Sequence, residues 1–190
     1  SNVQVSARPE NFLEQTTAIL HKREVQVKVL NDPEIHGWFS DFLEIDCRLV
    51  YQPTDLQRAV GQKYVEGVHT VSLADGFPYL MTNRASLYQL NLWVDSPAPI
   101  QMEAFRPNIV VDADWAFQED GWHEVMIGAQ KFILPIPCQR CKVTTVLQEK
   151  GRIRTDKEPL RSLAKFRQGV FTTKFGDPVQ LNGVWFGMNG

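Results

Sequence analysis

The sequence lacks several features that would assign the chain to a class at once. No apolar run approaches the roughly 18 residues that a membrane-spanning helix needs, and the first residues show no basic segment followed by an apolar one. The net charge is only -2, and acidic and basic residues are scattered, so there is no basic field to attract nucleic acid or an anionic membrane. We therefore expect a soluble protein with no nucleic-acid and no membrane partner.

Cysteine and histidine are also scarce, with three and four residues in a chain of 190. An odd number of cysteines in a chain too large to need disulfides predicts a reducing compartment, and the cytoplasm is the expected location. The sequence has no phosphate-loop signature, no dinucleotide-binding glycine fingerprint and no serine–histidine–aspartate order. These absences give no support for nucleotide-binding sites of those types or for a serine hydrolase.

The residues that are present favour a folded domain, because 43% of the side chains are apolar. Alternation of apolar and polar residues predicts a strand over residues 25–29. Asp32-Pro33 is typical of a helix start, and it precedes apolar residues at helical spacing. Those residues are Ile35, Trp38, Phe39, Phe42 and Leu43.

The rest of the chain is predicted to be rich in strands. Residues 47–51 favour a strand, residues 52–66 an exposed loop, and Thr82 a cap for a helix that contains Leu87 and Leu90. Pro159 opens a further helix. Short β-branched or aromatic runs predict strands at residues 109–111, 124–128, 131–134 and 142–146. Such spacing indicates a barrel or folded sheet, so the expected class is mainly β with flanking helices (α+β).

The clearest local motif is a C-x-x-C pair, Cys138 and Cys141, with Arg140 and Lys142 beside the second sulfur. Neighbouring cations favour a thiolate, which is both a nucleophile and a soft metal ligand. Three alternatives stay open. A structural zinc site needs about four ligands, but the remaining cysteine and the histidines are isolated; a thioredoxin-type dithiol needs a helix start, where a strand is predicted; and both cysteines could be unreactive core residues.

Two further turns contain residues suited to binding. Arg106 and Asn108 flank a proline before an apolar strand; the arginine fork suits phosphate or carboxylate, and the asparagine suits the edge of a heterocycle. The alternative is a surface arginine and a turn-stabilising asparagine. Asp75-Gly76-Phe77 forms a tight turn whose backbone N–H groups could approach an anion, although Asp75 could simply stabilise the turn.

These motifs and their order resemble the MOSC (molybdenum cofactor sulfurase C-terminal) family over about residues 25–190. The likeness is greatest to the mitochondrial amidoxime reducing components and their bacterial relatives that reduce N-hydroxylated bases. The matching segments are DGFPYLMTNRASLYQLN from Asp75, FRPNIVV from Phe105, FQEDGW from Phe117, CQRCKVTTV from Cys138 and EPLRSLAKFR from Glu158.

The resemblance implies a MOSC-type β-barrel that binds the molybdenum cofactor (Mo-molybdopterin); pyridoxal phosphate is not expected. The second cysteine of C-x-R-C is the molybdenum ligand and catalytic residue in the family, which is Cys141 here. Arg106, Asn108, Gln139 and Arg140 fall on positions that hold the cofactor. Their chemistry agrees with the argument made from the residues alone.

The resemblance is weaker at one corner and at both ends. After Asp75 the family has small hydroxyl residues that meet the cofactor, whereas this chain has Gly76 and Phe77, so only backbone contacts could persist at Gly76. Residues 1–24 are expected to be an N-terminal extension or the remnant of a preceding β-rich half. Residues 25–190 are expected to form the MOSC domain, truncated at its C-terminal hairpin.

The function implied by the resemblance is that of a molybdenum-dependent oxidoreductase. It would reduce small N-hydroxylated molecules with electrons from a partner redox protein or domain, ferredoxin-like or a flavoprotein. Two alternatives remain: a sulfur carrier that bears a persulfide on Cys141, and a cofactor-free binding or scaffold domain.

Overall fold

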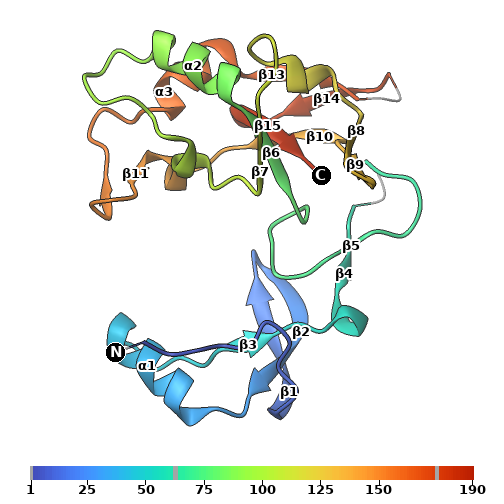
Figure 1. The fold of residues 1–190 in the computed structure, drawn as a ribbon, viewed down its shortest axis with the longest axis vertical. Helices are drawn as coiled ribbons and strands as arrows, with labels where there is room; N and C mark the ends of the chain where they lie inside the picture. The colour runs from blue at the N-terminus through green and yellow to red at the C-terminus, as the bar shows by residue number, and fades with distance from the viewer. Residues whose placement is uncertain (1, 62–63, 174–175) are drawn as a thin grey trace. The chain divides into compact units, whose positions relative to one another are not determined.

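The computed structural model describes residues 2–61, 64–173 and 176–190, and the chain divides into two compact units (Figure 1). Unit 1 comprises residues 1–61 and 67–76, and unit 2 comprises residues 62–66 and 77–190. No helix within the described ranges is long and apolar enough to cross a membrane.

Unit 1 is built on a three-stranded antiparallel sheet in the order β1-β2-β3. Its elements are β1 (Phe12–Leu20), β2 (Arg23–Leu30), α1 (Pro33–Leu43), β3 (Val50–Tyr51), the 3-10 turn η1 (Thr54–Leu56), β4 (Arg58–Ala59) and β5 (Thr70–Val71). The strand predicted over residues 25–29 lies in β2, where Val25, Val27 and Val29 are buried. The expected domain boundary after residue 24 falls inside β2.

Helix α1 confirms the predicted start, because the Asp32 carboxylate accepts a hydrogen bond from the Ile35 N–H at 3.1 Å and Pro33 occupies the first turn. The apolar face is less covered than its spacing suggested. Ile35 is buried, whereas Phe42 is 72% and Leu43 53% exposed. Periodicity therefore predicted the helix but not how much of its apolar face a neighbouring element would cover.

Unit 2 has a central sheet in the order β10-β15-β6-β7, in which β6 and β7 are parallel and the other pairs antiparallel. Its helices and 3-10 turns are α2 (Arg84–Trp93), η2 (Met102–Phe105), η3 (Gln118–Gly121), η4 (Lys142–Thr145) and α3 (Leu160–Phe166). Its strands are β6 (Leu80–Asn83), β7 (Ile109–Val111), β8 (Glu124–Ile127), β9 (Gln130–Ile133), β10 (Ile136–Gln139), β11 (Val146–Leu147), β12 (Arg152–Ile153), β13 (Gly169–Thr172), β14 (Pro178–Leu181) and β15 (Trp185–Asn189).

The fold class is confirmed as mainly β with three helices. β8–β9, β11–β12 and β13–β14 are separate hairpins, and no sheet among the described residues closes on itself. The predicted barrel is therefore not confirmed.

The core of unit 2 has two parts. One surrounds the central sheet and includes Met81, Ile136 and Met188. The other joins α2 and α3, which lie on one side of that sheet, through Leu90, Leu163 and Phe186 (Figure 1). This second part also buries Phe105, whose ring stacks on that of Phe186 at 4.0 Å. The core thus fixes the residue that immediately precedes Arg106.

Two sequence predictions in unit 2 were wrong. The segment 142–146 begins as the 3-10 turn η4 and not as a strand, because the Thr144 and Thr145 hydroxyls donate back to the carbonyls of Cys141 and Lys142 at 2.9 and 2.7 Å. The cap of α2 is Asn83 and not Thr82, since the Asn83 side chain accepts from the Ala85 N–H at 3.0 Å.

Two predictions in unit 1 were only partly realised. The strand expected over 47–51 is limited to β3, and the loop expected over 52–66 contains η1 and β4. Residues 62–63 of that loop lie outside the described residues.

Candidate functional site

Cys141 lies at the junction between β10 and η4, with an exposed side chain. Its carbonyl accepts hydrogen bonds from the Thr144 N–H at 3.1 Å and from the Thr144 hydroxyl at 2.9 Å. These bonds fix the backbone of the turn while the thiol faces solvent. A thiol so placed is accessible to a metal or to an electrophile.

Arg140 contacts the other cysteine of the motif. Its Nη1 donates to Cys138 Sγ at 2.8 Å, its Nη2 donates to the Phe105 carbonyl at 2.7 Å, and its backbone N–H donates to the Val184 carbonyl at 2.8 Å. The expectation that Arg140 acts directly on the Cys141 sulfur is therefore not realised. Being next to Cys141 in the sequence does not determine where the Arg140 side chain points, and here its guanidinium donates a hydrogen bond to the Phe105 carbonyl.

The Arg106–Asn108 turn lies beside the cysteine turn, because Arg140 bridges from Cys138 to Phe105. Arg106 is exposed and has left-handed backbone geometry, with φ of 55°. Asn108 Oδ1 accepts from the Leu80 N–H at 2.9 Å, and its own N–H donates to the Leu80 carbonyl at 3.0 Å. Asn108 thus joins the ends of β6 and β7, which confirms a turn-stabilising role.

Gln139 ends β10, with an exposed side chain. Phe77 is half-buried and packs against the core around the central sheet, so its ring serves packing. Asp75 and Gly76 belong to unit 1. There the carbonyls of Ala74 and Asp75 accept hydrogen bonds from Arg58, and the Asp75 carboxylate lies 3.8 Å from His21 Nε2.

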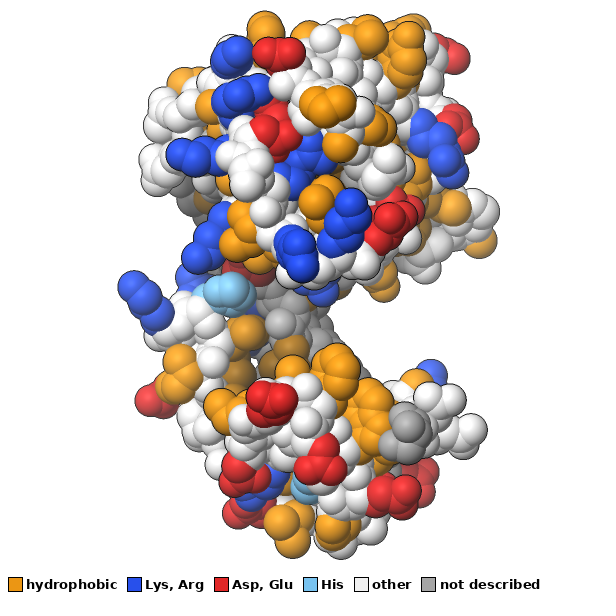
Figure 2. All heavy atoms as spheres, turned by 90° about the vertical axis from the view of Figure 1, so that its left-hand side faces the viewer, with side chains coloured by type: hydrophobic (Ala, Val, Ile, Leu, Met, Phe, Trp, Pro, Cys, Tyr) orange, Lys and Arg blue, Asp and Glu red, His pale blue; other side chains and the backbone are white. Residues whose placement is uncertain are grey.

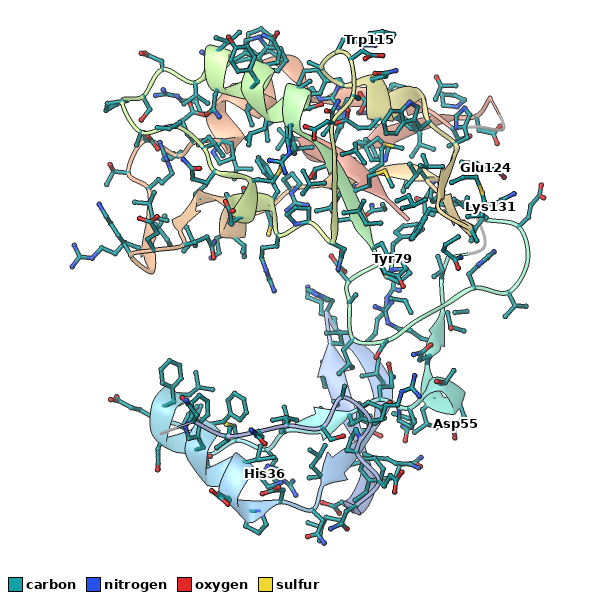
Figure 3. All side chains as sticks on the ribbon, viewed as in Figure 1. His36, Asp55, Tyr79, Trp115, Glu124 and Lys131 are labelled. Atoms are coloured by element: carbon teal, nitrogen blue, oxygen red, sulfur yellow. The ribbon has the colours of Figure 1, made fainter. Side chains whose placement is uncertain are left out.

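A closed zinc site finds no support in the described part of the chain, where no group of three or more His, Cys, Asp and Glu residues could hold a metal ion. His36, labelled in Figure 3, is engaged at both ring nitrogens: Nδ1 accepts from the Leu49 N–H at 3.1 Å, and Nε2 lies 2.8 Å from the Leu30 carbonyl. A metal at Cys141 would need its other ligands from a cofactor or substrate.

Positive charge is concentrated after Cys141. Residues 140–161 include seven Lys or Arg and three Asp or Glu. Figure 2 shows Lys and Arg side chains gathered on one face of unit 2. Arg106 and Lys142 are exposed, and neither forms an ion pair with a residue that the structure describes. An accessible thiol near unpaired cations fits an anionic cofactor that binds its metal through sulfur.

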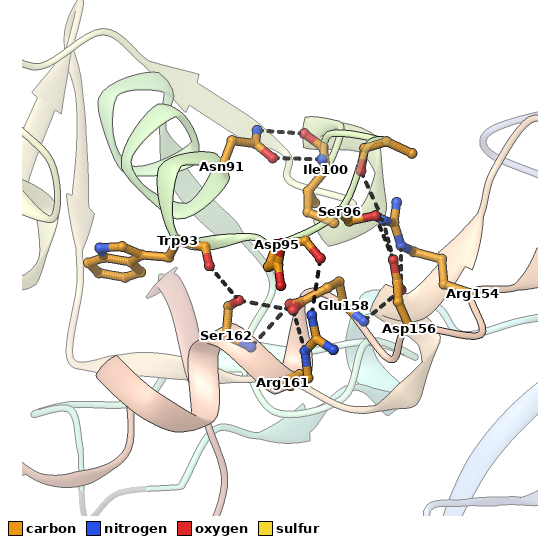
Figure 4. Close-up of polar contacts among 11 residues, drawn as sticks. Asn91, Trp93, Asp95, Ser96, Ile100, Arg154, Asp156, Glu158, Arg161 and Ser162 are labelled. Carbon is orange, nitrogen blue, oxygen red and sulfur yellow. Dashed lines mark hydrogen bonds and ion pairs between the residues drawn. The ribbon is translucent and has the colours of Figure 1, made fainter.

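Two buried glutamates lie within segments that the sequence comparison singled out without assigning them a role. Glu119 is fully buried; the Ser86 hydroxyl donates to it at 2.7 Å and the Asn83 amide at 3.0 Å. Burial raises the pKa of Glu119 above its ordinary value. Glu158 is also fully buried and accepts from the N–H and hydroxyl of Ser162 at 3.1 and 3.0 Å (Figure 4).

These glutamates hold helices in place through their hydrogen bonds to Ser86 and Ser162. Glu119 joins η3 to the first turn of α2, and Glu158 joins the preceding loop to α3. The sequence contained a signal in each case, because Ser86 and Ser162 lie in segments predicted as helical and both glutamates lie in segments that resemble the MOSC family. The Glu119–Ser86 pairing could not be inferred, because it joins residues 33 positions apart, whereas the Glu158–Ser162 contact is local and joins residues four positions apart.

The arrangement defines an α+β domain that presents one thiol and unpaired cations at two adjacent turns. The family model for the MOSC domain matches residues 68–184. The chain therefore belongs to the MOSC domain family, and the resemblance seen in its motifs is confirmed.

Curated relatives agree with this assignment. The chain is 37% identical over 138 residues to mitochondrial amidoxime reducing component 2 of Macaca fascicularis, covering 70% of this chain and 40% of that protein. It is 34% identical over 152 residues to mitochondrial amidoxime-reducing component 1 of Mus musculus, covering 78% and 44%. It is 33% identical over 155 residues to molybdenum cofactor sulfurase of Danio rerio, covering 73% and 18%.

The chain thus spans less than half the length of these relatives. It is homologous to proteins associated with the molybdenum cofactor. Because two of the relatives are named as mitochondrial, the cytoplasmic location expected from cysteine usage stays a prediction.

Proposed function

We propose that the chain is the cofactor-binding part of a molybdenum-dependent oxidoreductase that reduces N-hydroxylated small molecules. The observation that supports this most directly is the exposed Cys141 thiol on a turn fixed by Thr144, in a family whose relatives include amidoxime reducing components. Reduction of an N–OH group to N–H consumes two electrons and two protons and releases water. A partner redox protein, ferredoxin-like or a flavoprotein, would supply the electrons.

The residues of unit 2 would divide the work of holding Mo-molybdopterin. The Cys141 thiolate would ligate molybdenum, and the exposed Arg106 would pair with the anionic part of the cofactor. Gln139 and the side-chain amide nitrogen of Asn108 would donate hydrogen bonds. When bound, the cofactor supplies the redox chemistry, while the protein supplies the ligand and the orientation.

Arg140 has a different task in this proposal. Because its guanidinium already contacts Cys138 and the Phe105 carbonyl, it would set the spacing between the thiol turn and the Arg106 turn. The MOSC domain would extend over residues 25–190, beyond the matched segment at both ends.

The test compares Cys141→Ser with Cys138→Ser in chain purified from cells that make the molybdenum cofactor. We expect Cys141→Ser to lower molybdenum and pterin per chain by at least about tenfold, because the metal loses its thiolate. Cys138→Ser should spare most of both, since a serine hydroxyl can still accept from Arg140. Equal losses at the two positions would refute the assignment of the ligand.

A second candidate function is sulfur transfer, favoured by the exposed thiol together with the molybdenum cofactor sulfurase relatives. In that case Cys141 would bear a persulfide. Purified chain would then release cyanolysable sulfur, Cys141→Ser would not, and molybdenum would be absent from both. Molybdenum without cyanolysable sulfur would favour the reductase.

A further inference from the structure

Unit 2 has a cavity that the proposed cofactor contacts do not use. It has a volume of about 410 Å³, within the usual range of about 300–1,000 Å³ for small-molecule sites. Two loops form its walls, residues 98–104 before the Arg106 turn and residues 144–150 after the Cys141 turn, and Arg154 completes it. Ile100, Val146 and Leu147 provide apolar surface.

Arg154 is held in a fixed orientation within this cavity. Its side chain is only 5% exposed, and its Nε and Nη2 contact the Asp156 carboxylate at 3.1 and 2.8 Å. Nη2 also donates to the Ser96 hydroxyl and to the Ala98 carbonyl; Figure 4 shows Arg154 beside Ser96 and Asp156. Nη1 has no partner among the described residues and is not sealed from solvent. A buried arginine thus lines the cavity and retains one donor group that no described residue occupies.

The charges around the cavity limit what it can bind. Glu103 and Glu149 line it together with Lys150 and Arg154, and Asp156 neutralises Arg154. With Asp156 included, three carboxylates accompany two cations, so the cavity has no net positive charge to attract an anionic ligand. The Arg154 donor requires an acceptor, and a cationic head group such as an amidinium has none to offer. The fitting ligand is therefore uncharged, with an apolar body and a hydrogen-bond acceptor.

The cavity begins close to Cys141. Thr144, which lines it, donates from both its N–H and its hydroxyl to the Cys141 carbonyl. One turn of 3-10 helix, which rises about 6 Å, separates the two residues along the chain. We infer that the cavity binds the uncharged organic body of a small-molecule substrate whose reacting group is handled at the Cys141 turn. That the ligand is a substrate rests on the proposed function, whereas binding of an uncharged small molecule in the cavity does not.

Three probes of one shape test the inference with the 190-residue chain and without cofactor: benzamide, benzoate and benzamidine, whose head groups are uncharged, anionic and cationic. We expect benzamide to bind roughly fivefold or more tighter than the others. Amide shifts in NMR titrations should be centred on residues that line the cavity, such as Thr144 and Lys150. Equal affinities, no benzamide binding, or shifts centred elsewhere would overturn the inference.

Substitutions distinguish benzamide binding in the cavity from nonspecific binding elsewhere on the protein surface. Gln101→Trp, an exposed position on the cavity wall, should weaken benzamide binding about tenfold by filling space. Gln130→Trp, an exposed position on β9, is the matched control and should leave binding unchanged. The double variant Glu103→Gln and Glu149→Gln should improve benzoate binding; an unchanged benzoate affinity would contradict the charge argument.

The two proposals can fail separately. If benzamide does not bind but Cys141 retains molybdenum, only the cavity inference fails. If benzamide binds as expected and the chain retains no molybdenum, only the oxidoreductase proposal fails.

Discussion

Two carboxyl groups of unit 2 have pKa values shifted in opposite directions. Burial raises the pKa of Glu119, so its contribution to stability is present below the ordinary value and is lost as pH rises through the raised value. Hydrogen bonds from Arg154 lower the pKa of Asp156, so its contribution is present above the ordinary value near 3.8 and is lost as pH falls. Lowering the pH therefore increases the stabilising contribution of Glu119 and decreases that of Asp156.

Asp156→Asn tests the second effect. We expect the variant to lose about 2 kcal/mol of stability at pH 7, because the buried Arg154 loses its charged partner. The variant should also show a smaller further loss between pH 5 and pH 3 than the parent chain. Urea unfolding at each pH measures both quantities.

Asp114→Asn, at an exposed position, serves as the control and should match the parent chain at every pH. If Asp156→Asn were as stable as the parent chain at pH 7, the ion pair with Arg154 would have no net stabilising effect.

Residue chemistry was the most predictable part of the candidate site. The motif singled out the Cys141 sulfur as a candidate ligand, and in the structure Cys141 is exposed and not a core residue. The partner of Arg140 could not be predicted, because it depends on where the Phe105 carbonyl lies after the core has folded. Asn108 illustrates the same limit, since its partner Leu80 lies 28 positions away in the chain.

At the scale of elements, the start of α2 shows how one residue can serve several neighbours. The Asn83 side chain caps the Ala85 N–H, and its amide donates to the Trp115 carbonyl and to Glu119, each at 3.0 Å. Trp115 itself lies at an outer loop of unit 2 (Figure 3). One buried amide thus links the start of α2 to two other segments of unit 2.

Asn83→Ala is expected to lower the free energy of unfolding by about 2–3 kcal/mol, because it removes both the helix cap and a hydrogen bond to a buried carboxylate. Thr82→Val should cost less than about 1 kcal/mol, because the Thr82 hydroxyl contacts only the Met102 sulfur among the described residues. Chemical denaturation of both variants checks the order. The reverse order would restore Thr82 as the cap.

Helices and strands were predicted well where a local pattern was strong and poorly where tertiary contacts decide. Asp32-Pro33 identified the start of α1, and the spacing after it identified the helix. The β-branched run at 143–146 favoured a strand, but back-bonding by Thr144 and Thr145 made the 3-10 turn more stable there. Strands β13 and β14, which pair with each other, were not predicted.

At the scale of the whole chain, the division into two units was not visible in the sequence. No composition shift or low-complexity linker marks the change near residue 77. Overall class was predictable, because strand-forming runs and turn residues dominate the sequence. Sheet closure was not, since it depends on long-range pairing that local patterns do not specify.

Val27→Ala tests whether the units have independent cores. Val27 is fully buried in β2, and the substitution should destabilise unit 1 by about 2 kcal/mol. Hydrogen exchange should accelerate in residues 12–51 and stay unchanged in α2 and β15 of unit 2. Uniform acceleration across both units would show that the chain unfolds as one cooperative body.

The guanidinium of Arg140 has a consequence for anyone who wishes to move this site onto another scaffold. Because it links Cys138 to the Phe105 carbonyl, the Cys141 loop and the Arg106 loop are held together by hydrogen bonds. A graft of the cysteine loop alone would present the Cys141 thiol without Arg106 beside it. Transplantation should succeed only when both loops and the aromatic pair beneath them, Phe105 and Phe186, travel together.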